Sequence, residues 1–290
     1  MTVITGGDLR KAMVFHAIWT ANVHHITNSP ANMDYGKLDK GPPVSELRSI
    51  SVLALANSLR MPYESVRRYA EALRRDGICA RHDGEGLTIN PDFLERTPDR
   101  DRIIQASYLS FVEFLADLRH AGFDFQPYML PASPALGEQI PMLGRAIMRL
   151  CSAFVMRTTE SLTQSHRDDY IAALIHTALY AANLREHFKA MPSLGADDAL
   201  LPAREFLRPV SVRMLAGRIR LPFETVRRHC TRMREGVEVF QIGRKGLVVS
   251  LDLDEENRCG EAVRRICFDA HRLMGELHRN GLNIHTPAAP

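Results

Sequence analysis

Two pairs of adjacent arginines are the residues of this chain whose type and spacing point most clearly to chemistry. They are Arg67–Arg68, in the string PYESVRRYA, and Arg227–Arg228, in the string PFETVRRHC. A guanidinium is always charged and presents a planar fork of N–H donors, which can bond a phosphate or a guanine edge with two parallel hydrogen bonds. The two strings therefore indicate recognition of phosphates and base edges.

Both strings belong to a longer duplication with a spacing of 160 residues. Residues 48–75 and 208–235 align without a gap, and 12 of the 28 positions are identical. The similarity continues with a small slip into GICARHDGEGLTI and GVEVFQIGRKGLVV, and upstream it places His16 over His176. A solenoid needs three or more short repeats, so two long copies predict a pair of like domains.

Positive charge is concentrated in the duplicated segments. Residues 48–75 hold six Arg and two Glu, and residues 208–235 hold eight Arg and two Glu, whereas the whole chain has a net charge of only +3. Such concentration is typical of a surface that binds the phosphate backbone of a nucleic acid.

Local patterns predict the elements that position the arginines. Ser51 fits the N-cap of a short helix over 52–59, and Pro62 fits the first turn of a second helix. "ICAR" and "GLTIN" around "HDGE" predict a two-stranded hairpin, and the second copy repeats the scheme. The residues expected to pack the second helix against the core are Tyr63, Val66, Ala70 and Leu73.

This order of elements is that of a winged helix-turn-helix. The string SVLALANSLRMPYESVRRYAEALRRDGI resembles the DNA-binding domains of bacterial transcriptional regulators of the MarR and GntR kinds, over about 45 residues in each copy. The resemblance implies a mainly α fold with small β-wings. It also implies two tandem winged helix-turn-helix domains joined by a helical bundle, with an intrachain pseudo-two-fold.

The repeats predict a domain organisation. We expect a first unit over 1–130, a bridging helix over 131–165 and a second unit over 166–290. The winged cores are expected at 44–95 and 204–252, with flanking helices at 8–26, 101–121, 166–187 and 258–281. In MarR-like proteins such helices form the dimer interface, so the resemblance implies either a monomeric pseudo-dimer or a homodimer.

The resemblance assigns DNA contacts to the first turns of the second helix, to the turn before it and to the wing. The residues expected to contact double-stranded DNA are Arg60, Ser65, Arg67, Arg68, Arg81, His82, Arg220, Thr225, Arg227, Arg228, Arg244 and Lys245. An ordinary solvated charged face is the alternative. Tyr63 and Phe223 are expected in the core instead.

Glu64 and Glu224 depart from the family pattern. A carboxylate there could accept a hydrogen bond from cytosine, pair with Arg68 four residues later, or complement the helix dipole. The last two alternatives are favoured.

A helical core that includes His16, Trp19 and His176 could enclose a small apolar effector, as in MarR-like proteins. The same residues also fit an ordinary hydrophobic core, which is the more common role of an apolar stripe with an isolated histidine. Both interpretations stay open.

Composition and motif searches narrow the function class. The five cysteines form no C-x-x-C pair, no signal peptide is visible, and the uncharged apolar stretch 171–183 is too short to cross a bilayer. We therefore expect a cytoplasmic protein without membrane contact, metal or cofactor. Since no catalytic motif is found, we expect no enzyme.

The sequence predicts a bacterial-type, sequence-specific DNA-binding transcriptional regulator with two winged readers on a pseudo-palindromic site. Two alternatives stay open. One is a plasmid-type replication initiator with two winged-helix domains, and the other is a winged-helix scaffold that binds proteins.

Overall fold

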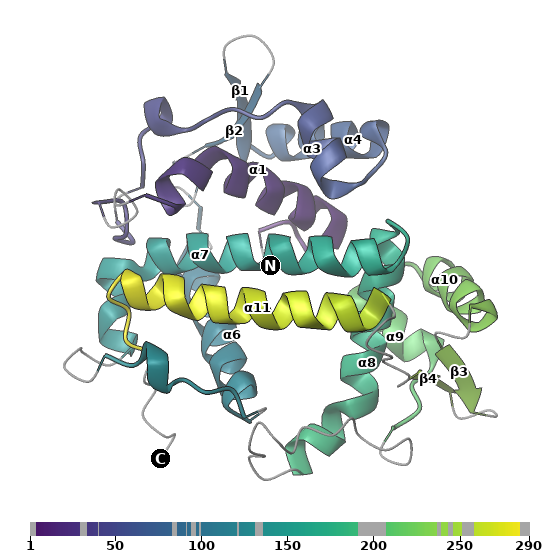
Figure 1. Ribbon diagram of the computed structural model, residues 1–290. Coiled ribbons are helices and arrows are strands. Elements are labelled where there is room, and N and C mark those ends of the chain that lie inside the picture. The colour runs from purple at the N-terminus through teal and green to yellow at the C-terminus, as the bar shows by residue number, and fades with distance from the viewer. Residues whose placement is uncertain are drawn as a thin grey trace. The chain divides into compact units, whose positions relative to one another are not determined.

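The computed structural model describes residues 4–29, 34–39, 41–82, 86–90, 92–93, 97–98, 100–120, 122–130, 136–190, 207–236, 239–242, 246–250 and 258–284. These residues are mainly helical and include two small antiparallel two-stranded sheets (Figure 1). This confirms the expected mainly α class with small β-hairpins. No helix within the described ranges combines the length and the apolar character needed to cross a membrane.

The α-helices are α1 (Leu9–Thr27), α3 (Val52–Leu59), α4 (Tyr63–Arg75), α6 (Arg100–His120), α7 (Leu136–Ser165), α8 (Tyr170–Ala190), α9 (Val212–Ile219), α10 (Phe223–Glu235) and α11 (Arg258–Arg279). Two short 3-10 helices are η1 (Val44–Glu46) and η2 (Gln126–Tyr128). The strands are β1 (Cys79–His82), β2 (Gly86–Ile89), β3 (Val239–Ile242) and β4 (Gly246–Val249).

The chain folds into two compact units. Unit 1 comprises Met1–Leu115, Phe125–Thr158 and Cys267–Pro290, and unit 2 comprises Ala116–Asp124 and Thr159–Ile266. Helices α6, α7 and α11 each contribute residues to both units. How the two expected repeat units divide the chain stays a prediction.

Each unit contains the same succession of a short helix, a tight turn, a longer helix and a hairpin. We call residues 50–89, with α3, α4, β1 and β2, module 1, and residues 210–249, with α9, α10, β3 and β4, module 2. The short helices begin as expected, because Ser51 Oγ accepts the amide of Ala54 at 3.1 Å and Ser211 Oγ accepts that of Met214 at 3.2 Å.

The tight turn has the same unusual backbone in both modules. Arg60 and Arg220 close the short helices in the left-handed region, at φ values of 50° and 52°. The next residue then bonds back to the helix, with Met61 N 3.1 Å from Ala56 O and Leu221 N 3.2 Å from Ala216 O. Left-handed backbone costs a non-glycine residue about 1 kcal/mol, so the turn is held by its surroundings.

The hairpin of each module is tied to the residue that precedes the short helix. Ile50 pairs with Leu87 of β2, and Val210 pairs with Leu247 of β4. Gly246 lies in this contact at a φ of 136°, where an added Cβ would come within 2.7 Å of the Val210 carbonyl group. A side chain there is disfavoured both by the backbone conformation and by the lack of space.

Buried asparagines fix the modules to the preceding helices. Asn22 of α1 and Asn183 of α8 are both fully buried, at 0% exposure. Asn22 Nδ2 donates to the carbonyls of Arg48 (2.7 Å) and Leu87 (3.0 Å), and its Oδ1 accepts the amide of Ile89 at 2.7 Å.

Asn183 repeats this frame in unit 2. It donates to Arg208 O at 2.7 Å and Leu247 O at 3.1 Å, and it accepts from Val249 N at 3.0 Å. Each asparagine therefore joins the segment just before its module to the second strand of the hairpin.

The asparagines also correct the sequence alignment. Their spacing is 161 residues instead of 160, so His176 corresponds to Phe15 and Thr177 to His16. The expected equivalence of His16 and His176 is wrong, because the chain between the asparagine and the module is one residue longer in unit 1.

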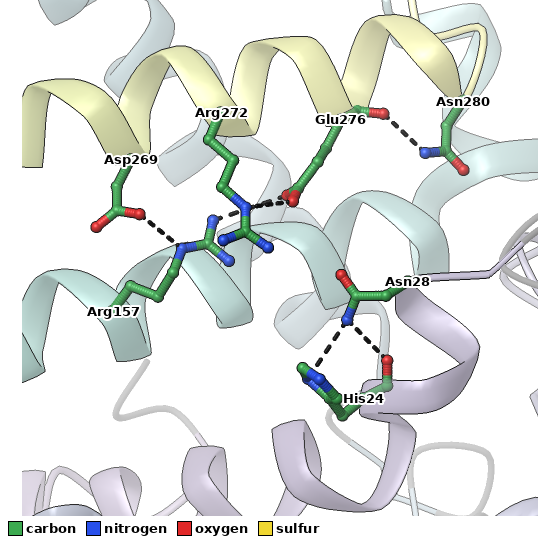
Figure 2. A network of polar contacts seen from close by, with 7 residues as sticks. All are labelled: His24, Asn28, Arg157, Asp269, Arg272, Glu276 and Asn280. Carbon is green, nitrogen blue, oxygen red and sulfur yellow. Dashed lines mark hydrogen bonds and ion pairs between the residues drawn. The ribbon is translucent and has the colours of Figure 1, made fainter.

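Within unit 1, α7 and α11 run side by side in opposite directions and are joined by charged side chains (Figures 1 and 2). Arg157 Nε donates to Asp269 Oδ1 at 2.9 Å, and Arg157 Nη2 lies 3.7 Å from Glu276 Oε2. Arg272 Nε donates to the other Glu276 oxygen at 2.8 Å. The side chains of Asp269 and Glu276 are only 11% and 10% exposed, so they depend on the arginines for compensation.

Candidate nucleic-acid interface

The longer helix of each module separates an apolar face from a cationic face. In α4 the buried residues are Val66, Ala70 and Leu73, and in α10 they are Val226, His229, Cys230 and Met233. The arginines lie on the opposite side. Every arginine of residues 48–75 and 208–235 is exposed, so the net charges of these segments, +4 and +6, lie at the surface.

Arg67 and Arg227, the residues expected to read bases, each form an ion pair with the glutamate three positions earlier. Arg67 Nη2 lies 2.8 Å from Glu64 Oε2, and Arg227 bonds both oxygens of Glu224 at 2.7 and 2.8 Å. The hydrogen bond from Arg227 lowers the pKa of Glu224. Each glutamate thus pairs with the arginine three positions later. The expectation that Glu64 pairs with Arg68, four positions later, is wrong.

Arg68 and Arg228 have other surroundings. The Arg68 guanidinium lies 5.1 Å from the centre of the Tyr69 ring, a cation–π distance, and this tyrosine is replaced by His229 in α10. Arg228 has no ion-pair partner within the part of the chain that the structure describes. Of the two adjacent arginines in each longer helix, the first is therefore paired with a carboxylate and the second presents its charge to solvent.

Tyr63 and Phe223 are exposed, which corrects the expectation that they belong to the core. Their exposed fractions are 45% and 47%. They are the first residues of α4 and α10, and side chains on a helix lean toward its N-terminus. Their side chains consequently extend past the first turn of the helix. The helix packs on the core through later residues, which in α4 are Val66, Ala70 and Leu73.

The other residues expected at the helix start are placed at the surface or near it. Arg60 and Arg220 are exposed at the left-handed turns, immediately before the longer helices. Ser65 and Thr225 are half-buried in the first turn. The backbone carbonyl of Thr225 accepts a hydrogen bond from His229 Nδ1 at 2.7 Å.

Of the hairpin residues expected to contact DNA, the structure describes the side chain of Arg81 alone. Arg81 is exposed on β1 and shares a shallow surface hollow with Glu71 and Arg74. Arg81 therefore extends the charge near the C-terminal half of α4, roughly 10 Å along the helix from Arg67. His82 belongs to β1, but its side chain lies outside the described residues, as do Arg244 and Lys245.

Module 2 carries an ionic contact that holds α10 to the start of α8. His229 Nε2 lies 3.3 Å from Asp169 Oδ2, and Arg232 Nη2 lies 3.5 Å from the same oxygen. The hydrogen bond from His229 lowers the pKa of Asp169 to about 2. Both ring nitrogens of His229 therefore face oxygen atoms, Nδ1 that of the Thr225 carbonyl and Nε2 that of the Asp169 carboxylate.

The three residues considered for an effector pocket are divided between the two units. His16 and Trp19 line a cavity in unit 1. His176 belongs to unit 2 and packs on His166, with ring centres 4.8 Å apart. Among the described residues no group of three or more His, Cys, Asp or Glu side chains is placed to hold a metal ion.

Sequence reasoning missed Asn22 and Asn183, which hold both modules in place. The sequence did contain a signal, because an alanine precedes the asparagine in both copies, as Ala21–Asn22 and Ala182–Asn183. Comparison of the chain with protein-family models, with curated proteins and with solved structures finds no match.

Proposed function

We propose that this protein binds double-stranded DNA through two winged helix-turn-helix readers, module 1 and module 2, and that it regulates transcription. In this proposal α4 and α10 are the recognition helices, and the hairpins are the wings. The winged helix is the fold with this order of a short helix, a tight turn, a longer helix and a hairpin.

One observation carries the proposal. The two modules share an asparagine frame, a left-handed arginine turn and an arginine pair in the first half of the longer helix, and every arginine of the modules that the structure describes is exposed. Two exposed cationic helices with the same N-terminal chemistry fit insertion into the major groove, where base edges are read.

The glutamate–arginine pairs are compatible with base reading. Both partners of each pair are more than half exposed, so the pair contributes little stability and an arginine can leave its carboxylate for a phosphate or a guanine. Before binding, the pair restricts Arg67 and Arg227 to an orientation in the first half of the helix. Glu64 and Glu224 also repel phosphates, so wrongly placed backbone contacts are disfavoured.

Tyr63 and Phe223 add an apolar element to the same surface. An aromatic side chain at the tip of a recognition helix can contact the methyl group of thymine. We therefore assign to each reader one aromatic residue and two arginines, which together favour a site with neighbouring thymine and guanine bases.

Salt dependence of DNA binding tests the function directly. Binding of the intact protein to a random duplex should weaken steeply with added salt, because each neutralised phosphate releases counterions. Arg68→Ala with Arg228→Ala should lower the slope of log affinity against log salt by about 1 for each lost phosphate contact. Arg185→Ala, on the exposed surface of α8, is the control and should leave the slope unchanged.

A weak, salt-independent interaction with the duplex would contradict the proposal. It would favour the winged-helix scaffold that binds proteins. Selective binding to origin repeats over promoter fragments would instead favour the replication initiator.

A further inference from the structure

Unit 1 contains a cavity of about 380 Å³ that neither the modules nor their proposed function uses. Its walls come from α1, α6 and α7, and Ile4, Leu38 and Leu273 also contribute to the lining. Protein interiors pack as densely as organic crystals, and their voids seldom exceed a water molecule. A space of this size belongs to the range of small-molecule pockets, which begins at about 300 Å³.

The wall near Leu38 is held by specific bonds to α7. Leu38 N donates to Pro141 O at 3.1 Å, and Arg145 Nε donates to Leu38 O at 2.9 Å. Gly144 provides the space, since a Cβ at this position would lie 2.6 Å from a Leu38 methyl carbon. These contacts fix Leu38 against α7 and so fix this part of the cavity wall.

The chemistry of the lining is apolar and uncharged. None of the described residues that line the cavity is Asp, Glu, Lys or Arg. Aromatic and aliphatic side chains dominate, among them Phe15, Trp19, Phe111 and Ile147.

The polar groups of the lining are Ser107, Tyr108 and Ser110 on α6 and, at the end formed by α1 and α7, His16, Cys151 and Ser152. His16 Nδ1 lies 3.3 Å from the hydroxyl of Ser152, and Cys151 is next to Ser152 in α7. Burial lowers the pKa of His16 to about 4 and raises that of the Cys151 thiol to about 12. Both groups are neutral near pH 7, so this end offers hydrogen bonds without charge.

We propose that the cavity binds a small, uncharged, mainly apolar molecule that places one polar group at His16 and Ser152. A charged molecule is disfavoured because it would lose its hydration without gaining a counter-charge. This binding involves no DNA, so the proposal can fail or succeed independently of the proposed function.

Trp19 provides the assay, because it is the single tryptophan of the chain and it lines the cavity. N-phenyl-1-naphthylamine is an uncharged aromatic probe, and 8-anilinonaphthalene-1-sulfonate has the same rings with an added sulfonate. Titration of the full-length protein with the uncharged probe should quench Trp19 emission in a saturable manner. The sulfonate should bind at least about tenfold more weakly, because its charge has no partner in the cavity.

Two variants of α6 locate the binding. Ala106→Phe places a ring in the cavity and should abolish quenching, whereas Gln105→Phe, at the exposed neighbouring position, should leave it unchanged. Melting curves show whether each variant folds, and the comparison of the two probes on the unaltered protein decides the question without any variant. Absence of saturable quenching, equal affinity for both probes, or equal binding by a folded Ala106→Phe variant would overturn the proposal.

Discussion

Asn22→Ala is the substitution whose effect can be worked out most fully from the structure. The amide of Asn22 is fully buried and makes three hydrogen bonds, two of them in fully buried surroundings. An alanine leaves the carbonyls of Arg48 and Leu87 and the amide of Ile89 without this partner. A buried polar group left unsatisfied costs about 1–3 kcal/mol, so the two buried bonds and the half-buried one together predict a loss of about 3–5 kcal/mol.

Urea unfolding followed by circular dichroism measures this loss. The matched control is Asn28→Ala at the C-cap of the same helix, where an exposed amide donates to His24 O at 2.8 Å (Figure 2) and should contribute less than about 1 kcal/mol. Asn183→Ala should match Asn22→Ala to within about 1 kcal/mol, because its three bonds have the same geometry. If Asn22→Ala is no more destabilising than Asn28→Ala, the idea that this frame holds module 1 is wrong.

Three further predictions concern stability and are checked by the same unfolding measurement. Gly246→Ala should destabilise by more than about 1 kcal/mol because of its φ and its contact with Val210. Gly217→Ala, at an exposed position of α9 with open space around it, should instead stabilise by up to about 1 kcal/mol. The lowered pKa of Asp169 makes its carboxylate stabilising above about pH 4, and this contribution is lost as the pH falls toward 2. The stability difference between the parent protein and Asp169→Asn should therefore shrink over that range, and a constant difference would contradict the ionic contact. Arg157→Met should cost about 3–5 kcal/mol, because it leaves the two α11 carboxylates of Figure 2 buried with less compensation, and a neutral result would show that these carboxylates are solvated.

The local elements were predictable because their signals lie within a few residues. Ser51 as N-cap, the two helices and both hairpins follow from capping chemistry, helical spacing and turn residues. The duplication strengthened each assignment, because the same pattern had to fit twice.

The surface details were less predictable, because they depend on where a helix ends and which rotamer an arginine adopts. Tyr63 continues the apolar spacing of α4, yet it lies beyond the residues that the helix packs against. Glu64 has an arginine at both i+3 and i+4, and spacing alone does not choose between Arg67 and Arg68.

Long-range features required the fold itself. The asparagine frame joins Asn22 to residues that are 26 to 67 positions away, so no local pattern contains it. His16 and Trp19, which the sequence left open as either pocket or core residues, line the cavity, but the one-residue shift between the copies led to a wrong pairing of His16 with His176.

A footprint on selected DNA tests the central claim, that both modules of one chain read the same duplex. Genomic fragments bound by the intact protein are recovered first, and hydroxyl-radical protection is then compared for the parent, Arg67→Ala and Arg227→Ala. The parent should protect two half-sites about 10 base pairs apart, or a multiple of that distance. Each single variant should lose a different half-site, with a cost of about 1–3 kcal/mol for each lost base contact. Unchanged protection by both variants, or loss of the same half-site in both, would contradict two-reader binding.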